Sequence, residues 1–135
     1  MKGLGADARY WQALSAGRLE MQQCARCGHW HWPAVWRCGE CGSWEQQWHE
    51  VALRGTIFSW TRTHHDFGAP AQFKLPFVSV VVALEGAGHR RLMGTLQGDT
   101  STVHIGARVS GEIGRVIIDN EELPALRWRM VGAGA

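Results

Sequence analysis

All four cysteines of the chain fall within the segment CARCGHWHWPAVWRCGECGS, residues 24–43. They form two Cys-x-x-Cys pairs, Cys24 with Cys27 and Cys38 with Cys41, and in a reducing compartment such pairs are typical of metal ligands rather than disulfides. So short a segment cannot offset its own ordering entropy with a core, whereas a structural zinc site contributes about 10–16 kcal/mol. The spacing therefore predicts a rubredoxin-like zinc ribbon, with structural Zn²⁺ bound by the four thiolates.

Two glycines support this interpretation, because Gly28 and Gly42 each follow the second cysteine of a pair. A knuckle turn there often needs positive φ. Two other interpretations stay open, namely free buried cysteines and iron in the same cage, as in rubredoxin, with electron transfer as the function. A catalytic zinc is excluded, because four thiolates fill the tetrahedron and leave no position for water. For the same reason His29 and His31 are not expected to be ligands.

Tryptophan is unusually frequent in and beside the cysteine segment, which is too small to bury all of it. The four indoles there belong to Trp30, Trp32, Trp36 and Trp44. Such residues can pack the ribbon against the rest of the chain or another protein, or they can stack nucleic-acid bases. Only Arg26 and Arg37 accompany them, so the sequence favours packing.

The bulk composition is that of a globular protein. The chain has 135 residues, 45% of them hydrophobic, and a formal net charge of +2, which is too weak to indicate nucleic acid as a partner. Its longest apolar run, residues 77–84, is far too short to span a membrane. The opening residues 1–7 contain no apolar core of a secretory signal, so we expect a cytoplasmic protein.

The periodicity of the chain predicts a mainly β fold. A short amphipathic helix is expected over residues 7–17, with Asp7 in N-cap position and Gly17 at its end, and a short strand over 19–23. Five further strands, rich in β-branched and aromatic residues, are expected over 56–65, 76–85, 89–98, 107–114 and 125–131. Five short strands with glycine corners suit an OB-fold barrel better than a sandwich. The predicted domains are residues 1–46, the helix and ribbon, and residues 47–135, the OB-fold.

Two finer expectations concern single side chains. In the first barrel strand, Phe58 and Trp60 should share one face, while Ile57 lies on the other. Met93 is expected to belong to the core.

Several stretches resemble proteins of the DUF35 family, which combine a zinc ribbon with an OB-fold. They are YWQALSAGRLEMQQC, the two Cys-x-x-Cys-Gly units, GTIFSWT, LPFVSVVVALEGAG, HIGARV and ELPALRWR. The resemblance implies a non-catalytic accessory subunit that forms a hetero-oligomer with a thiolase-superfamily enzyme, such as an acyl-CoA thiolase or a steroid side-chain retro-aldolase. It also implies that the chain scaffolds this partner and helps to bind the acyl-CoA substrate.

The residues themselves give no reason to expect catalysis by this chain alone. Acyl transfer of the thiolase type needs a nucleophilic thiolate with a nearby base, and every cysteine here is assigned to metal. No serine stands in a Gly-x-Ser-x-Gly frame, and the carboxylates are scattered rather than paired.

The segment THHDFGAPAQFKLPF, residues 63–77, is the loop richest in chemically active side chains. His64 and His65 could protonate a thioester oxygen or orient a base of the partner. The candidate substrate-binding residues are His64, His65, Phe67, Phe73, Lys74 and Phe77, with the rings lining an acyl tunnel and the lysine meeting a CoA phosphate. The alternative is an ordinary surface loop with two solvated histidines.

A different class of function is a single-stranded nucleic-acid binder that uses the barrel groove and the ribbon tryptophans. The strands TIFSWT and FVSVVVALE disfavour it, because they lack the interleaving of basic and aromatic residues that a nucleic-acid platform needs.

Overall fold

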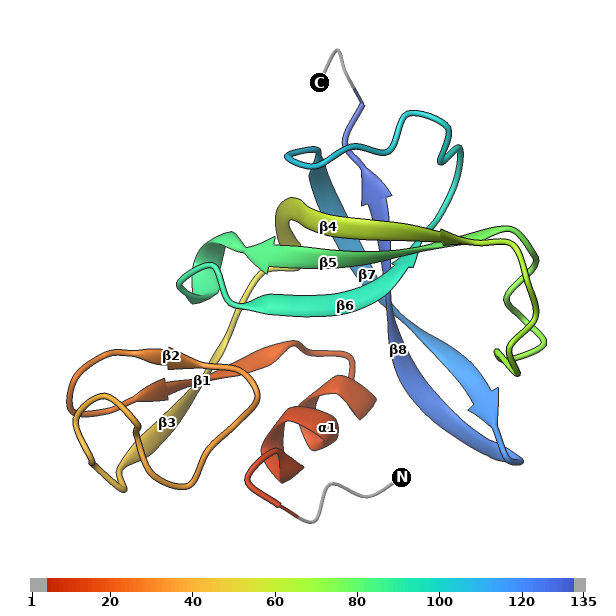
Figure 1. The fold of residues 1–135 in the computed structure, drawn as a ribbon. Coiled ribbons are helices and arrows are strands. Elements are labelled where there is room, and N and C mark those ends of the chain that lie inside the picture. The colour runs from red at the N-terminus through yellow and green to blue at the C-terminus, as the bar shows by residue number, and fades with distance from the viewer. Residues whose placement is uncertain (1–4, 133–135) are drawn as a thin grey trace.

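The computed structural model of the chain describes residues 5–132. Within these residues one α-helix, α1 (Ala8–Ser15), precedes a three-stranded antiparallel sheet in the order β2-β1-β3. The strands of this sheet are β1 (Glu20–Cys24), β2 (Trp30–His31) and β3 (Gln46–Glu50). Figure 1 shows this small sheet beside α1 at one end of the molecule, below the larger barrel. The described residues contain no helix with the length and hydrophobicity that a membrane span needs.

The second sheet is a closed five-stranded barrel in the order β4-β5-β6-β8-β7, with β7 returning to pair with β4. Its elements are β4 (Arg54–Thr63), β5 (Phe77–Leu84), the 3₁₀ helix η1 (Glu85–Ala87), β6 (Arg91–Leu96), β7 (Arg108–Ile118) and β8 (Glu121–Met130). All neighbours are antiparallel except β6 and β8. This architecture confirms the predicted mainly β fold, with an N-terminal helix, a zinc-ribbon region and a five-stranded OB-type barrel.

Three strands differ from the prediction, one in the ribbon and two in the barrel. The ribbon sheet includes β3, which pairs with β1 over five residues and was not expected from the sequence. The last two barrel strands are longer than predicted, because Asp119 and Asn120 form a two-residue turn with φ of 51° and 62°. Such a turn joins strands directly. The resulting β7–β8 hairpin extends beyond the barrel in Figure 1.

A β-bulge in β4 overturns the predicted alternation. Ile57 and Ser59 pair with consecutive residues of β5, so Phe58 is an extra residue in the strand. Trp60 therefore packs against the same core as Ile57, whereas Phe58 is 49% exposed. The predicted grouping of Phe58 with Trp60 is wrong, because a bulge resets the two-residue period of a strand.

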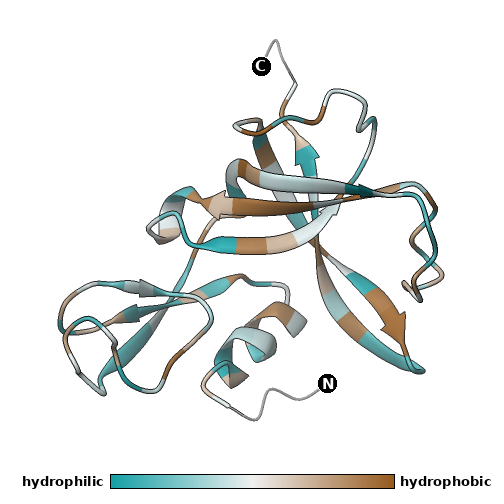
Figure 2. Cartoon of the chain, in the orientation of Figure 1, coloured by the Kyte–Doolittle hydropathy of each residue, from teal (hydrophilic) through white to brown (hydrophobic). Residues whose placement is uncertain are grey.

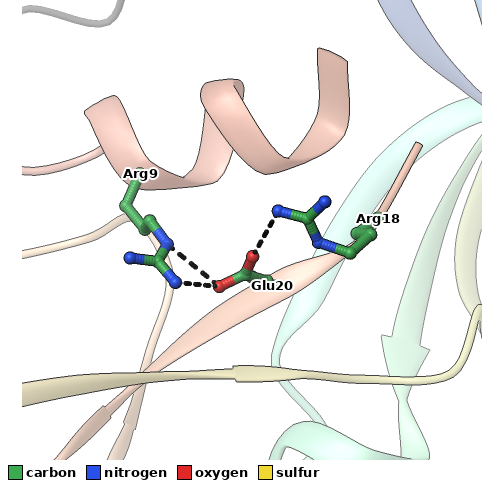
Figure 3. A network of polar contacts seen from close by, with 3 residues as sticks. All are labelled: Arg9, Arg18 and Glu20. Atoms are coloured by element: carbon green, nitrogen blue, oxygen red, sulfur yellow. Dashed lines mark hydrogen bonds and ion pairs between the residues drawn. The ribbon is translucent and has the colours of Figure 1, made fainter. Parts of the chain in front are cut away.

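Helix α1 is fastened to the ribbon sheet by a buried carboxylate. Glu20 is 5% exposed, and its two oxygens lie 3.0 Å from Arg9 Nη2 and 3.3 Å from Arg18 Nη2 (Figure 3). Asp7 stands in the N-cap position as predicted, but its carboxylate accepts from the Trp11 indole at 2.9 Å instead of capping the helix. Arg9 therefore links α1 to β1 through the Glu20 carboxylate.

One continuous core joins the helix, the ribbon and the barrel. It contains Tyr10 and Leu14 of α1, Met21 of β1 and the inward residues of the barrel strands. In Figure 2 the hydrophobic colour is strongest along β5, while the ribbon is mostly hydrophilic or pale. The ribbon therefore contains few residues of high hydropathy.

The largest fully buried side chain is Trp128, and two glycines make room for its indole. A Cβ on Gly94 of β6 would lie 2.7 Å from both the Leu126 carbonyl and the indole, and a Cβ on Gly111 of β7 would lie 2.7 Å from the other edge of the ring. The packing of Trp128 requires glycine at both positions, which lie within strands and not in turns.

We expect Gly94→Ala to lower the free energy of unfolding by about 1–3 kcal/mol, because its methyl group meets the backbone and a fully enclosed indole. Urea denaturation followed by circular dichroism measures this loss. Gly39→Ala is the matched control, since its Cβ would meet nothing within 4 Å. Equal unfolding midpoints for Gly94→Ala and the unmodified chain would contradict the packing argument.

Candidate functional site

The four cysteine sulfurs converge on one point at the end of the ribbon. Their Sγ atoms all lie within 4.8 Å of one another, with Cys24 3.6 Å from Cys41 and Cys27 3.6 Å from Cys38. A tetrahedral metal with bonds of about 2.3 Å holds its sulfurs about 3.8 Å apart. The donor set and its spacing therefore fit a four-thiolate metal ion.

Each Cys-x-x-Cys pair is a knuckle closed by a backbone hydrogen bond. Gly28 N–H donates to the Cys24 carbonyl at 3.0 Å, and Gly42 N–H donates to the Cys38 carbonyl at 2.9 Å. Both glycines have φ of 80°. This is the left-handed region that the sequence analysis expected, and a side chain there would be strained.

The first knuckle favours the thiolate form of Cys24. The backbone N–H of Cys27 donates to Cys24 Sγ at 3.5 Å, and this contact is the main reason why the pKa of Cys24 falls from its usual 9.0 to about 6. In the same knuckle the backbone hydrogen bond from His29 lowers the pKa of Cys27, but desolvation and hydrogen bonds with the other cysteines outweigh it and raise this pKa to about 12. Metal ions bind thiolates rather than thiols, so within this pair the turn favours Cys24 as the first thiolate.

The histidines of the segment face the barrel instead of the sulfurs. His29 Nε2 lies 2.7 Å from Arg90 Nη2, and the His29 and His31 rings are 5.0 Å apart. Burial, assisted by the nearby charges of His29 and Arg90, lowers the pKa of His31. Because a guanidinium can only donate, His29 Nε2 is the acceptor of this hydrogen bond.

The ribbon is held against the barrel by close packing as well as by this hydrogen bond. The Trp30 side chain covers Gly88, where a Cβ would come within 2.8 Å of the indole. Within the ribbon, the buried amide of Gln22 bonds both the N–H and the carbonyl of Val35 at 2.9 Å. The loop between the knuckles is therefore fixed to β1.

The structure divides the six candidate substrate-binding residues of the 63–77 loop into two groups. His64, His65 and Phe67 are exposed, with the His65 and Phe67 rings 4.7 Å apart. Strand β4 ends at Thr63, so His64 and His65 lie outside the strand, although the prediction over residues 56–65 included them.

The second group lies at a cavity of about 270 Å³ between the loop and the end of β6. Phe73, Lys74 and Phe77 line it, and the two phenylalanine rings are 5.2 Å apart. The loop thus contributes three of the six residues to a cavity and leaves the other three exposed.

A second, more apolar cavity of about 290 Å³ adjoins Phe73, and we call it the α1 groove. Its walls come from α1 (Tyr10, Trp11, Leu14), β5 and β6 (Ser79, Met93, Gly94, Thr95) and β8 (Pro124, Ala125, Leu126). The sequence alone does not reveal this groove, because its walls come from segments that are far apart along the chain. The prediction that Met93 is core is wrong, since its side chain is 68% exposed while its neighbour Leu92 points inward.

The outer face of β4, β5 and β6 is the surface that binds oligonucleotides or oligosaccharides in many OB-folds. Here it consists largely of hydroxyl-bearing and small apolar side chains, namely Thr56, Ser59, Thr61, Ser79, Val81, Ala83, Met93 and Thr95. Among the residues paired across these strands, its one cation is Arg91, whose Cζ lies 4.0 Å from the Phe58 ring. This face has no stripe of positive charge for a phosphate backbone.

Two family models match the chain. One, described as the rubredoxin-like zinc ribbon domain of ChsH2, matches residues 11–45, and the other, described as the C-terminal OB-fold domain of ChsH2, matches residues 48–113. No curated protein matches the chain in sequence.

Two solved structures are similar in fold. A chain of the structure described as "Ltp2-ChsH2(DUF35) aldolase" is 27% identical with a TM-score of 0.78, over 93% of this chain and 94% of that one. A protein of unknown function from the DUF35 family of Sulfolobus solfataricus is 17% identical with a TM-score of 0.62, over 96% of this chain and 87% of that one. At that identity the second likeness concerns the fold alone.

The four cysteines give metal binding a pH dependence of defined sign. Zn²⁺ requires deprotonated ligands, and a free thiol has a pKa of about 8.5, so below neutrality protons compete with the metal for the sulfurs. We therefore expect the apparent Zn²⁺ affinity, measured by chelator competition, to fall at least about tenfold per pH unit below neutrality. Cys24→Ser is the control with weakened binding throughout, and a flat affinity profile would contradict the four-thiolate site.

Proposed function

Because the chain belongs to the DUF35 family, with a zinc ribbon and an OB-fold of the ChsH2 type, we propose that it is a non-catalytic accessory subunit of a thiolase-superfamily enzyme. That enzyme is a thiolase or a retro-aldolase acting on an acyl-CoA. The observation that carries the proposal is the likeness, over 93% of this chain, to a chain of the Ltp2-ChsH2(DUF35) aldolase.

The metal in this proposal is a structural Zn²⁺ held by Cys24, Cys27, Cys38 and Cys41. Four thiolates close the coordination shell, so the ion stabilises the ribbon and leaves no site for substrate or water. The same cage accepts iron, which would make the protein red, whereas zinc leaves it colourless. The absorption spectrum and the metal content of the purified protein distinguish the two.

An accessory role agrees with the chemistry that the chain carries. All four cysteines are in the proposed metal cluster, so the thiolate nucleophile of an acyl-CoA reaction must come from another subunit. What this chain offers is shape, apolar surface and a few cations, which suffice to stabilise a neighbour and complete its substrate pocket.

The acyl-CoA would contact the loop between β4 and β5. Phe73 lines both the α1 groove and the cavity that Lys74 and Phe77 share, so an apolar chain and a charged head could lie on either side of its ring. His64 and His65 are exposed beside this region and stay candidates for contacts that form only in the complex. This arrangement supports a part in acyl-CoA binding.

We expect a mixture of this chain with the thiolase-superfamily protein of its host to run as one larger species in size-exclusion chromatography. Acyl-CoA turnover should require both proteins, because neither alone has a complete pocket. If the chain stays separate from every such protein and instead binds oligonucleotides with a steep fall of affinity in salt, the accessory role is wrong and nucleic acid is the ligand.

Substituting both His64 and His65 by alanine should lower the turnover of the assembled complex without changing assembly or zinc content, since both side chains are exposed and away from the cysteines. A loss of about 10- to 100-fold is expected if one of them transfers or orients a proton. His104→Ala, an exposed histidine on another loop, is the matched control. Unchanged turnover in the double variant would assign the pair to an ordinary surface loop.

A further inference from the structure

The eight tryptophans of the chain separate into two structural groups. Trp128 is fully buried in the barrel. Five others are partly buried and pack against the same core, namely Trp11, Trp30, Trp32, Trp48 and Trp60. Trp36 and Trp44 stand apart, because they are 66% and 70% exposed and contribute nothing to that core.

These two exposed indoles lie on either side of the second knuckle, Trp36 on the segment that enters it and Trp44 on the segment that leaves it. Cys38 N–H donates to the Ser43 carbonyl at 2.8 Å, so the segments that enter and leave the knuckle run side by side. This places Trp44 beside Arg37, whose Cζ lies 5.9 Å from the centre of the indole, and Trp36 is the next residue in the chain. We call Trp36, Arg37 and Trp44 the knuckle patch.

The patch is attached to a rigid support. Arg37 Nε donates to the Gly42 carbonyl at 2.9 Å, which fixes the plane of the guanidinium over the knuckle. The same knuckle carries Cys41, an exposed cysteine of the metal cluster. An arginine held in this way loses little conformational freedom when a partner covers it, so less of the binding free energy is spent on ordering its side chain.

The chemistry of the patch indicates what would cover it. Tryptophan and arginine are the residues most enriched among those that dominate protein–protein binding energy. The guanidinium of Arg37 has no carboxylate partner in the part of the chain that the structure describes, so its Nη donors stay available. The complementary surface is an apolar protein face that presents an aspartate or glutamate to Arg37 and buries the two indoles beside it.

We propose that the knuckle patch is a docking surface for the catalytic subunit, centred on Trp36 and Trp44, with Arg37 pairing a carboxylate of that subunit. This inference rests on the proposed accessory function and adds the place of contact. Covering the patch also keeps water away from Cys41 and so protects the metal site.

The test measures the affinity of variants for the thiolase-superfamily protein that co-purifies with the unmodified chain, by biolayer interferometry. We expect the double variant Trp36→Ala/Trp44→Ala to weaken binding by about 100-fold or more, and Arg37→Ala by about 10-fold. Arg37→Lys should not restore affinity, because an ammonium cannot make the planar, bidentate pair. The matched control is Ile105→Ala, which removes an equally exposed apolar side chain (68%) from a barrel loop.

Zinc content and circular dichroism establish that each variant is folded, so a loss of affinity reports on the surface alone. If the unmodified chain binds and the double variant binds equally well, the docking surface is elsewhere and the accessory function stands. If the unmodified chain binds no such protein, both proposals fall. If the double variant instead loses affinity for an oligothymidine strand that the unmodified chain binds, the indoles stack on bases and the inference is overturned.

Discussion

The four-thiolate cluster is the constraint on which the rest of the structure depends. The ribbon sheet has three short strands with few residues of high hydropathy, so apolar burial within the ribbon contributes little to its order. The sulfurs supply what the core lacks, and the two glycines at φ of 80° let the backbone wrap around them. Everything that the ribbon positions, including the tryptophans packed on the barrel, depends on this local geometry.

The sequence predicted the parts of the fold that local chemistry determines. The cysteine spacing indicated the metal cluster and the glycine conformations, and short β-branched runs indicated the barrel strands. It did not predict the bulge at Phe58 or the extension of the β7–β8 hairpin, because an extra residue in a strand and a turn at Asp119-Asn120 depend on the pairing partner. The outward position of Met93 was missed for the same reason, since an apolar residue does not by itself reveal which face it occupies.

The candidate sites show the same limit at the level of tertiary structure. Residues adjacent in the loop sequence separate, with His64 and His65 exposed and Phe73 and Phe77 at a cavity. Residues that are far apart in the sequence come together, as in the α1 groove, which Tyr10 and Leu126 both line. No sequence motif predicts such a groove, because the residues that line it have no fixed spacing along the chain.

Helix α1 connects the two halves of the molecule, and through it the proposed metal centre would affect the groove. The Tyr10 ring lies 4.2 Å from the Trp32 ring of the ribbon and also lines the α1 groove. The Glu20 carboxylate ties the same helix to β1, whose last residue is the metal-ligand candidate Cys24. A ribbon without metal would lose the geometry that presents Trp32 and β1 to the helix. The wall of the groove would then lose its support, so a metal that touches no substrate still shapes the surface on which an acyl chain or a partner would rest.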